Sequence, residues 1–368
     1  MKRRLNIAFF GSSLVSAYWN GAATYYRGII RALHARGHRV TFYEPDAYDR
    51  QKHRDLGEVS WARVVVYRGD DDREALRCVE EARGADVLVK ASGIGVYDEL
   101  LEAAIPAARR PGALALFWDV DAPATLARVR GNPADPFRAL IPKYDMILTY
   151  GGGDPVVRSY TGLGARRCVP VYNALDPDTH HRVAPDSRFT ADLAFLANRL
   201  PDREARAEAY FFEVARALPR QRFLLGGNGW HDRPMPENVG YVGHVYTADH
   251  NAFNSTPRAV LNVARDSMAA LGFSPATRVF EAAGAAACLI TDAWEGIELF
   301  LEPDREVLLA RDGDEVARHM ASLTEERARA IGEAARRRIL AHHTYAERAR
   351  QVEALLEPET STLDAVTP

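Results

Sequence analysis

The sequence contains few cysteines and no cysteine motif of the kind that binds metals. Cys78, Cys168 and Cys288, the 3 cysteines among 368 residues, lie far apart and within or beside apolar runs. No CxxC or Cys/His cluster occurs, and the side chains of the neighbouring pairs 180–181 and 342–343, all histidines, point apart on a helix or strand. We therefore predict three reduced core thiols in a cytoplasmic protein, without disulfides or a zinc site.

The sequence also lacks a long hydrophobic segment and an excess of one charge. No stretch approaches the length of a membrane span, and the apolar run near the start breaks at Gly11, too early for a signal peptide. The 47 basic and 50 acidic residues give a net charge of −3. This balance argues against nonspecific binding to nucleic acid or anionic membrane, and nothing in the sequence indicates an oligomeric state.

What the sequence does contain is a regular alternation of apolar strands with amphipathic helices. A buried strand at 5–10 and a helix at 21–37 open a pattern that continues to about residue 173. Residues 174–190 are polar, carry two prolines and show no periodicity, and the alternation then restarts. Such alternation is typical of parallel βαβ units with right-handed crossovers.

We therefore predict an α/β protein with two Rossmann-like domains that face each other across a cleft. The expected parts are a first domain at 1–175, a linker at 176–190, a second domain at 191–344 and a last helix with a loose tail at 345–368. Ligands of open parallel sheets bind at the carboxyl ends of the strands, so the site is expected in the interdomain cleft.

The segment GFSPATRVFEAAGAAACLITD, residues 272–292, carries the strongest candidate site. Ser274 is a favourable N-cap and Pro275 a favourable first helical residue, so a helix N-terminus is predicted there that suits a phosphate. Thr277, Arg278 and Glu281 would share one face of that helix. By spacing alone, an Arg278–Glu281 ion pair on the surface is an equally good interpretation.

Two further groups of residues could bind a nucleotide. Arg199 and Arg203 stand at the end of one strand and the start of the next helix, where they could reach a diphosphate or simply be solvated. The loop after the first strand lacks GxGxxG, so a dinucleotide fingerprint is not met. Close backbone approach or a base pocket is indicated at Gly11, Ser12, Gly21, Gly227, Gly243 and His244.

Two acids in FWDVDAPATL are candidates for catalysis. Alternate residues of a strand share a face, so Asp119 and Asp121 could both point into the cleft as a general base or as hydroxyl ligands. The alternative is that Asp121 caps the following helix. This DxD lies in the first domain and is not predicted to hold a metal.

In this order, the segments resemble the GT-B glycosyltransferases, most of all the CgeB-like (spore maturation type) branch near glycosyltransferase family 4. The resemblance covers nearly the whole chain and rests on FWDVDAPATL, ILTYGGGDPVVRSYTGLGARRCVPVYNALDP, NRLPDRE, LNVARDSMAALGFSPATRVFEAAG and IGEAARRRILAHHTYAERA. It implies a nucleotide-sugar donor, with the ribose on Glu281 and the diphosphate on Ser274, Thr277 and Arg278. It also implies a last helix that crosses back to the first domain.

The sequence departs from this family at three places, one of which is GAAAC where an ACGTP-like turn is more usual. Phe273 stands where related enzymes often carry a Glu near the donor sugar, and no Lys follows Arg199, so Arg203 takes its place. We expect a glycosyltransferase without metal or other cofactor, whose acceptor binds near Gly11–Gly21 and the two acids. The family 4 likeness implies retention of configuration; an inverting enzyme would use Asp119 or Asp121 as base. A non-hydrolysing sugar-nucleotide epimerase and a catalytically silent GT-B protein are the alternatives.

Overall fold

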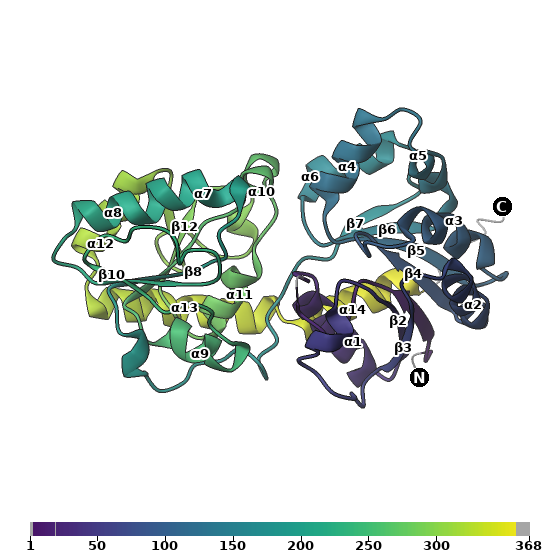
Figure 1. Cartoon of the computed structure of the whole chain (residues 1–368), viewed down its shortest axis with the longest axis horizontal. Helices are drawn as coiled ribbons and strands as arrows, with labels where there is room; N and C mark the ends of the chain where they lie inside the picture. The colour runs from purple at the N-terminus through teal and green to yellow at the C-terminus, as the bar shows by residue number, and fades with distance from the viewer. Residues whose placement is uncertain (1–2, 19, 358–368) are drawn as a thin grey trace, which may run out of the picture.

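Two α/β domains, each built on one parallel sheet, make up the molecule (Figure 1). The structure is a computed structural model that describes residues 3–18 and 20–357. The first sheet has the strand order β3-β2-β1-β4-β5-β6-β7, and the second has the order β10-β9-β8-β11-β12-β13. In both sheets the first strand of the domain lies inside and later strands are added on either side. This doubly wound order is that of the two Rossmann-like domains predicted, and it directs the ligand site to the carboxyl ends of the strands.

The first domain alternates strands and helices as the hydrophobic pattern predicts. Its strands are β1 (Asn6–Phe10), β2 (Arg39–Asp46), β3 (Arg63–Arg68), β4 (Val87–Ala91), β5 (Leu114–Asp119), β6 (Met146–Thr149) and β7 (Cys168–Pro170). Its helices are α1 (Ala23–Ala35), α2 (Asp72–Ala82), α3 (Asp98–Ala108), α4 (Ala122–Gly131), α5 (Pro136–Leu140) and α6 (Gly153–Gly162), with the 3-10 turns η1 (Arg50–His53) and η2 (Ile141–Lys143).

The second domain repeats this plan on a smaller sheet. Its strands are β8 (Leu193–Leu196), β9 (Phe223–Gly226), β10 (Val239–Tyr241), β11 (Ala259–Asn262), β12 (Leu289–Asp292) and β13 (Leu308–Ala310). Its longer helices are α7 (Pro201–Ala207), α8 (Glu213–Ala217), α9 (Thr247–Ser255), α10 (Asp266–Leu271), α11 (Thr277–Gly284), α12 (Gly313–Ser322) and α13 (Glu325–His342). One π-helical turn, η4 (Glu208–Phe212), joins α7 to α8, and the short 3-10 turns η3 (Ser187–Phe189) and η5 (Ile297–Leu299) complete the domain.

The last helix, α14 (Tyr345–Leu356), leaves the second domain and packs on α1 of the first, as the resemblance implied (Figure 1). Gly28 makes room for the Tyr345 ring, because a Cβ at Gly28 would lie 2.2 Å from it. The Tyr345 hydroxyl donates to Asn173 Oδ1 at 2.8 Å, and Gln351 Nε2 donates to the Pro170 carbonyl at 2.9 Å. The apolar face of α14 therefore completes the core of the first domain.

The two chain crossings between the domains are bonded to each other. Leu175 N donates to the His343 carbonyl at 2.8 Å, and Tyr345 N donates to the Leu175 carbonyl at 3.0 Å. These bonds form a parallel bridge between Leu175 and Thr344. The polar stretch predicted as a linker thus begins beside the C-terminal crossing.

As predicted for core thiols, Cys78, Cys168 and Cys288 are all buried and free. Within residues 3–18 and 20–357, no helix combines the length and apolar character needed to cross a membrane.

Candidate functional site

A cleft of about 410 Å³ lies between the two domains at the carboxyl ends of their strands. The first domain contributes the segments that follow β1, β2, β4, β5 and β6, together with the start of α1. The second domain contributes the first turn of α7, the loop after β11 and the segment that leads into α11. The volume is that of a small-molecule site, and its position is the one that the fold class predicts.

The structure brings part of the predicted set together in this cleft. The predicted residues that line it are Ser12, Gly21, Asp121, Arg203, Ser274 and Thr277. The predicted residues outside its lining are Gly11, Asp119, Arg199, Gly227, Gly243, His244, Arg278 and Glu281.

Three arginines face the cleft, and they differ in how their charge is balanced. Arg265 is neutralised by Asp202, with Nε 2.6 Å from Oδ2. Arg203 forms no ion pair or side-chain hydrogen bond with any residue in the described part of the chain, and its buried Nε has no partner. Burial lowers the pKa of Arg203, which means that the charged form is held at a cost in the free protein. Arg50 is the third arginine, and it comes from the first domain.

The helix that carries Glu281 begins two residues later than predicted. Its N-cap is Ala276, which has no capping side chain, so the expected Ser274 N-cap is wrong. Ser274 is buried and donates to the Gly272 carbonyl at 2.9 Å, a local turn that competes with capping. Without a side-chain cap or an acid in the first turn, the N–H groups at the start of α11 are left for a ligand in the cleft.

Phe273 occupies a contact between the domains. Its carbonyl accepts a 2.7 Å hydrogen bond from Gly152 N of the first domain. A Cβ at Gly153 would lie 2.6 Å from the Phe273 ring, and one at Gly296 would lie 2.2 Å from it, so both glycines are required for the ring to fit. The position that often holds a Glu in related enzymes is therefore packed between glycines of both domains.

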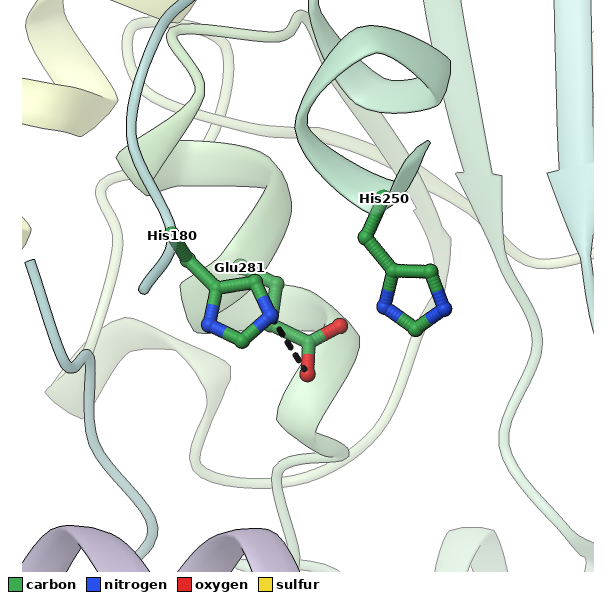
Figure 2. A group of neighbouring side chains, drawn as sticks. All are labelled: His180, His250 and Glu281. Atoms are coloured by element: carbon green, nitrogen blue, oxygen red, sulfur yellow. Dashed lines mark ion pairs between the residues drawn. The ribbon is translucent and has the colours of Figure 1, made fainter. Parts of the chain in front are cut away.

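Glu281 is buried in a cluster with Arg278 and two histidines, and Figure 2 shows the histidines beside its carboxylate. Arg278 Nη1 is 3.3 Å from one carboxylate oxygen, and His180 Nε2 is 3.6 Å from the other. His250, from α9, presents its unpartnered Nδ1 to the cluster while its Nε2 lies 3.2 Å from the Val245 carbonyl. The Arg278–Glu281 pair exists, but it is buried and not a surface pair.

Electrostatics in this cluster keep Glu281 charged and His250 neutral. Burial opposes ionisation of Glu281, but the charge of Arg278 outweighs this effect and lowers the pKa of the carboxyl. Burial, helped by the charge of Arg278, lowers the pKa of His250 to about 4. The ligand atoms of His180, His250 and Glu281 lie within 4.8 Å of one another, a set that could hold a metal ion. The guanidinium of Arg278 beside the same carboxylate works against a cation there.

The two acids of FWDVDAPATL do not share a face, contrary to the strand argument. β5 ends at Asp119, so the alternation does not continue to Asp121. Asp119 is buried and accepts hydrogen bonds from Ser92 Oγ at 2.7 Å, Thr125 Oγ1 at 3.0 Å and the Tyr160 hydroxyl. Asp121 caps α4 through Ala124 N and also lines the cleft, which combines both interpretations of that residue.

The predicted base-pocket glycines form one loop pair at the ends of β9 and β10. Gly227 N donates to the Gly243 carbonyl at 2.7 Å, and Asn228 Nδ2 lies 3.3 Å from His244 Nδ1. The next residue, Val245, accepts the contact from His250 described above, so this loop pair adjoins the Glu281 cluster. Arg199 lies on the same side of the domain but is held by Glu204 and by Asp232, the latter at 2.9 Å.

Sequence reasoning missed Arg50, Arg265, His180 and His250. Arg50 and His180 lie in polar stretches without periodicity, and the pair 180–181 was dismissed because adjacent side chains diverge. Divergence excludes the pair from one site but leaves each histidine free to meet residues from elsewhere in the chain. Only the fold shows that His180 meets α9 and α11.

The fold is the two-domain arrangement of solved GT-B glycosyltransferases. Residues 203–354 match the model of a family described as "Glycosyl transferase-like". No curated protein matches the sequence.

Several solved glycosyltransferases share the fold over nearly their whole length. Sucrose-phosphate synthase from Thermosynechococcus elongatus is 14% identical, with 96% of this chain and 98% of that chain covered and a TM-score of 0.69. HepE from Anabaena, solved with UDP and glucose, is 11% identical, with 96% and 99% covered and a TM-score of 0.68. AviGT4, a glycosyltransferase involved in avilamycin A biosynthesis, is 17% identical, with 96% and 97% covered and a TM-score of 0.60.

Proposed function

We propose that the protein transfers a sugar from a nucleoside-diphosphate sugar to an acceptor hydroxyl in the interdomain cleft. The observation that carries the proposal is the second-domain wall of the cleft, where the unpaired Arg203 and the uncapped start of α11 meet the same space. A diphosphate would satisfy both. Negative charge grows on the diphosphate as the glycosidic bond breaks, so these groups favour the transition state.

The rest of the nucleotide is proposed to follow the surface from this wall to the β9–β10 loop pair. The ribose would bind Glu281, whose carboxylate would exchange its contacts with Arg278 and His180 for the ribose hydroxyls. The base would lie against Gly227, Gly243 and His244. Uridine is the base we favour, because the HepE neighbours were solved with UDP or UDP-glucose.

For the chemistry we propose retention of configuration without a metal. The bond from the anomeric carbon to the diphosphate breaks, the acceptor oxygen bonds to the same face, and the departing phosphate oxygen takes the acceptor proton. This needs no protein base, and the enclosure of Asp119 by its hydrogen-bond donors supports that view. Asp121 is the residue that would serve as base if configuration were inverted.

The finer placement of the protein follows from the same reasoning. We propose membership of the CgeB-like branch near family 4, on the motifs quoted above. The three free buried thiols support a cytoplasmic enzyme.

Calorimetric titration with UDP, GDP, dTDP, ADP and CDP tests the donor site. We expect one diphosphate, UDP, to bind the wild type, and Glu281→Ala to weaken it at least tenfold. Glu298→Ala, which removes an exposed acid of the same domain, should bind like the wild type. Absence of binding by every diphosphate at millimolar concentration would refute the proposal. If UDP does bind, slow hydrolysis of the matching UDP-sugar would distinguish an enzyme from a silent binding protein.

A further inference from the structure

Arg50 is a buried cation in the cleft that forms no ion pair with a carboxylate of the described residues. Its residue is 7% exposed and lines the cleft from the first-domain side. Its Nη1 lies 3.3 Å from the carbonyls of Ser12 and Ile94, and its buried Nε has no partner. Among the described residues it takes part in no ion pair, and its only other contact of note is the Tyr48 ring, 5.0 Å from the guanidinium carbon. A buried charge in this state is destabilising unless a ligand completes it.

The nearby carboxylates are committed to other groups. Glu44, which is fully buried, accepts from Ser13 Oγ at 2.9 Å, from Leu14 N at 2.6 Å and from Gln51 Nε2 at 2.6 Å. Asp98 is bonded to Lys90 and to the backbone of the loop after β4. Neither is within ion-pair distance of Arg50 in the structure.

A second positive feature of the first domain opens into the same cleft. The 13-residue helix α1 begins there, since Gly21 and Ala22 line the cleft and Ala22 is the N-cap. No side chain caps α1, and no acid lies in its first turn. The N-terminus of α1 and the Arg50 guanidinium therefore both favour an anion on the first-domain wall of the cleft.

The donor accounts for one anion, and it belongs to the opposite wall. Arg203 and the start of α11 lie on the second domain, while Arg50 and the start of α1 lie on the first. Among the described residues, each wall thus has one arginine without an ion pair and one helix start without a side-chain cap. A nucleotide sugar carries a single diphosphate, so the first-domain wall is left to the acceptor.

We propose that the acceptor is a small molecule that carries a phosphate, or an oxyanion of like geometry, which binds between Arg50 and the N-terminus of α1. The inference rests on the proposed function and specifies the acceptor class for that same cleft. The Arg50 guanidinium, buried in the wall of a cleft of about 410 Å³, can contact the phosphate of a bound sugar phosphate. It cannot contact the backbone of a nucleic acid duplex that lies on the surface.

The test is a calorimetric titration of the UDP-saturated protein, in which the donor diphosphate site is already filled. The probes are inorganic phosphate, glucose 6-phosphate, fructose 6-phosphate and, as the matched neutral compound, glucose. We expect the phosphorylated sugars to bind at least tenfold more tightly than glucose. Arg50→Met should remove that preference and leave UDP affinity within twofold, whereas Arg50→Lys, which keeps the charge, should retain part of it. Arg73→Met, at an exposed arginine of α2, is the control and should change nothing.

Three results would overturn the inference. Equal binding of glucose and its phosphates would remove the anion site, and so would an unchanged preference in a folded Arg50→Met variant. If Arg50→Met lost the binding of UDP and of the sugar phosphates together, Arg50 would belong to the donor site and not to the acceptor site. The proposed function fails separately if the wild type binds no nucleotide. If phosphate binding still depended on Arg50 in that case, the anion site would exist in a protein that is not the proposed transferase.

Discussion

Arg203 and Arg206 stand one turn apart on α7 and should respond to substitution in opposite ways. Arg206 Nη2 lies 2.6 Å from Oδ2 of Asp292, a carboxylate that is fully buried. Arg203 has no such partner and faces the cleft. One arginine is therefore assigned to the stability of the domain and the other to a ligand.

Replacement of Arg203 by Met removes a charge that is desolvated in the free protein. We expect the free energy of unfolding to stay within about 0.5 kcal/mol of the wild type or to rise. A charge-assisted hydrogen bond to phosphate is worth about 1.5–3 kcal/mol, so UDP affinity should fall by about tenfold to a hundredfold. Arg206→Met leaves Asp292 with its bonds from Ala264 N and Thr291 Oγ1 but without its ion pair. This should reduce stability by about 2–3 kcal/mol and leave UDP affinity nearly unchanged.

The assay for both variants is urea unfolding followed by fluorescence, together with calorimetric UDP titration. The reasoning fails if Arg203→Met loses stability as Arg206→Met does, because Arg203 would then have a structural partner in solution. It also fails if Arg203→Met binds UDP like the wild type.

Three further predictions follow from the site. His250 has a pKa of about 4 in the folded protein and 6.5 in the unfolded chain. Its contribution to stability is therefore complete above pH 6.5 and is lost as the pH falls toward 4, which lowers the free energy of unfolding by about 2 kcal/mol at pH 5. Unfolding of His250→Gln, which keeps a donor for the Val245 carbonyl, should lack that part of the pH dependence, and a pH profile identical to that of the wild type would refute the prediction. Asp121→Asn should keep the α4 cap and the thermal midpoint, and it should slow hydrolysis of the UDP-sugar less than twofold if configuration is retained, whereas a loss of a hundredfold or more would indicate inversion with Asp121 as base. Gly28→Ala places a Cβ 2.2 Å from the Tyr345 ring and should destabilise the protein by about 1–3 kcal/mol in urea unfolding, while Gly84→Ala, where nothing lies within 4 Å, should not.

The inner strands of both sheets were predictable because they are buried on both faces and therefore read as short apolar runs, such as LNIAFF and DLAFLAN. The crossing of the last helix followed from family resemblance, not from its periodicity. Helix α10 (Asp266–Leu271) escaped notice because it is short and none of its residues is buried, so it leaves no apolar stripe.

The site was harder to predict than the fold, because its residues act through contacts that are distant in sequence. Arg278 and Glu281 were correctly paired by their spacing, but their burial comes from His180 and α9, about 100 and 30 residues upstream. Serine is a residue type favoured at N-caps, yet the Ser274 hydroxyl instead donates to the Gly272 carbonyl in a local turn. Arg50 gave no sequence signal at all, since only the tertiary structure shows that no carboxylate reaches it.

The position of α14 has a consequence for how the protein is made. The core of the first domain includes Tyr345, Ala349, Val352 and Leu356, which are synthesised after the whole second domain. At an elongation rate of about 5–20 residues per second, the second domain takes on the order of ten to forty seconds to synthesise. During this time the apolar surface of the first domain beside α1 is not yet covered by α14. During that interval the nascent chain offers a surface to chaperones and to other chains. A ribosome that stalls inside the second domain would therefore release two defective domains and not one complete domain with a truncated neighbour.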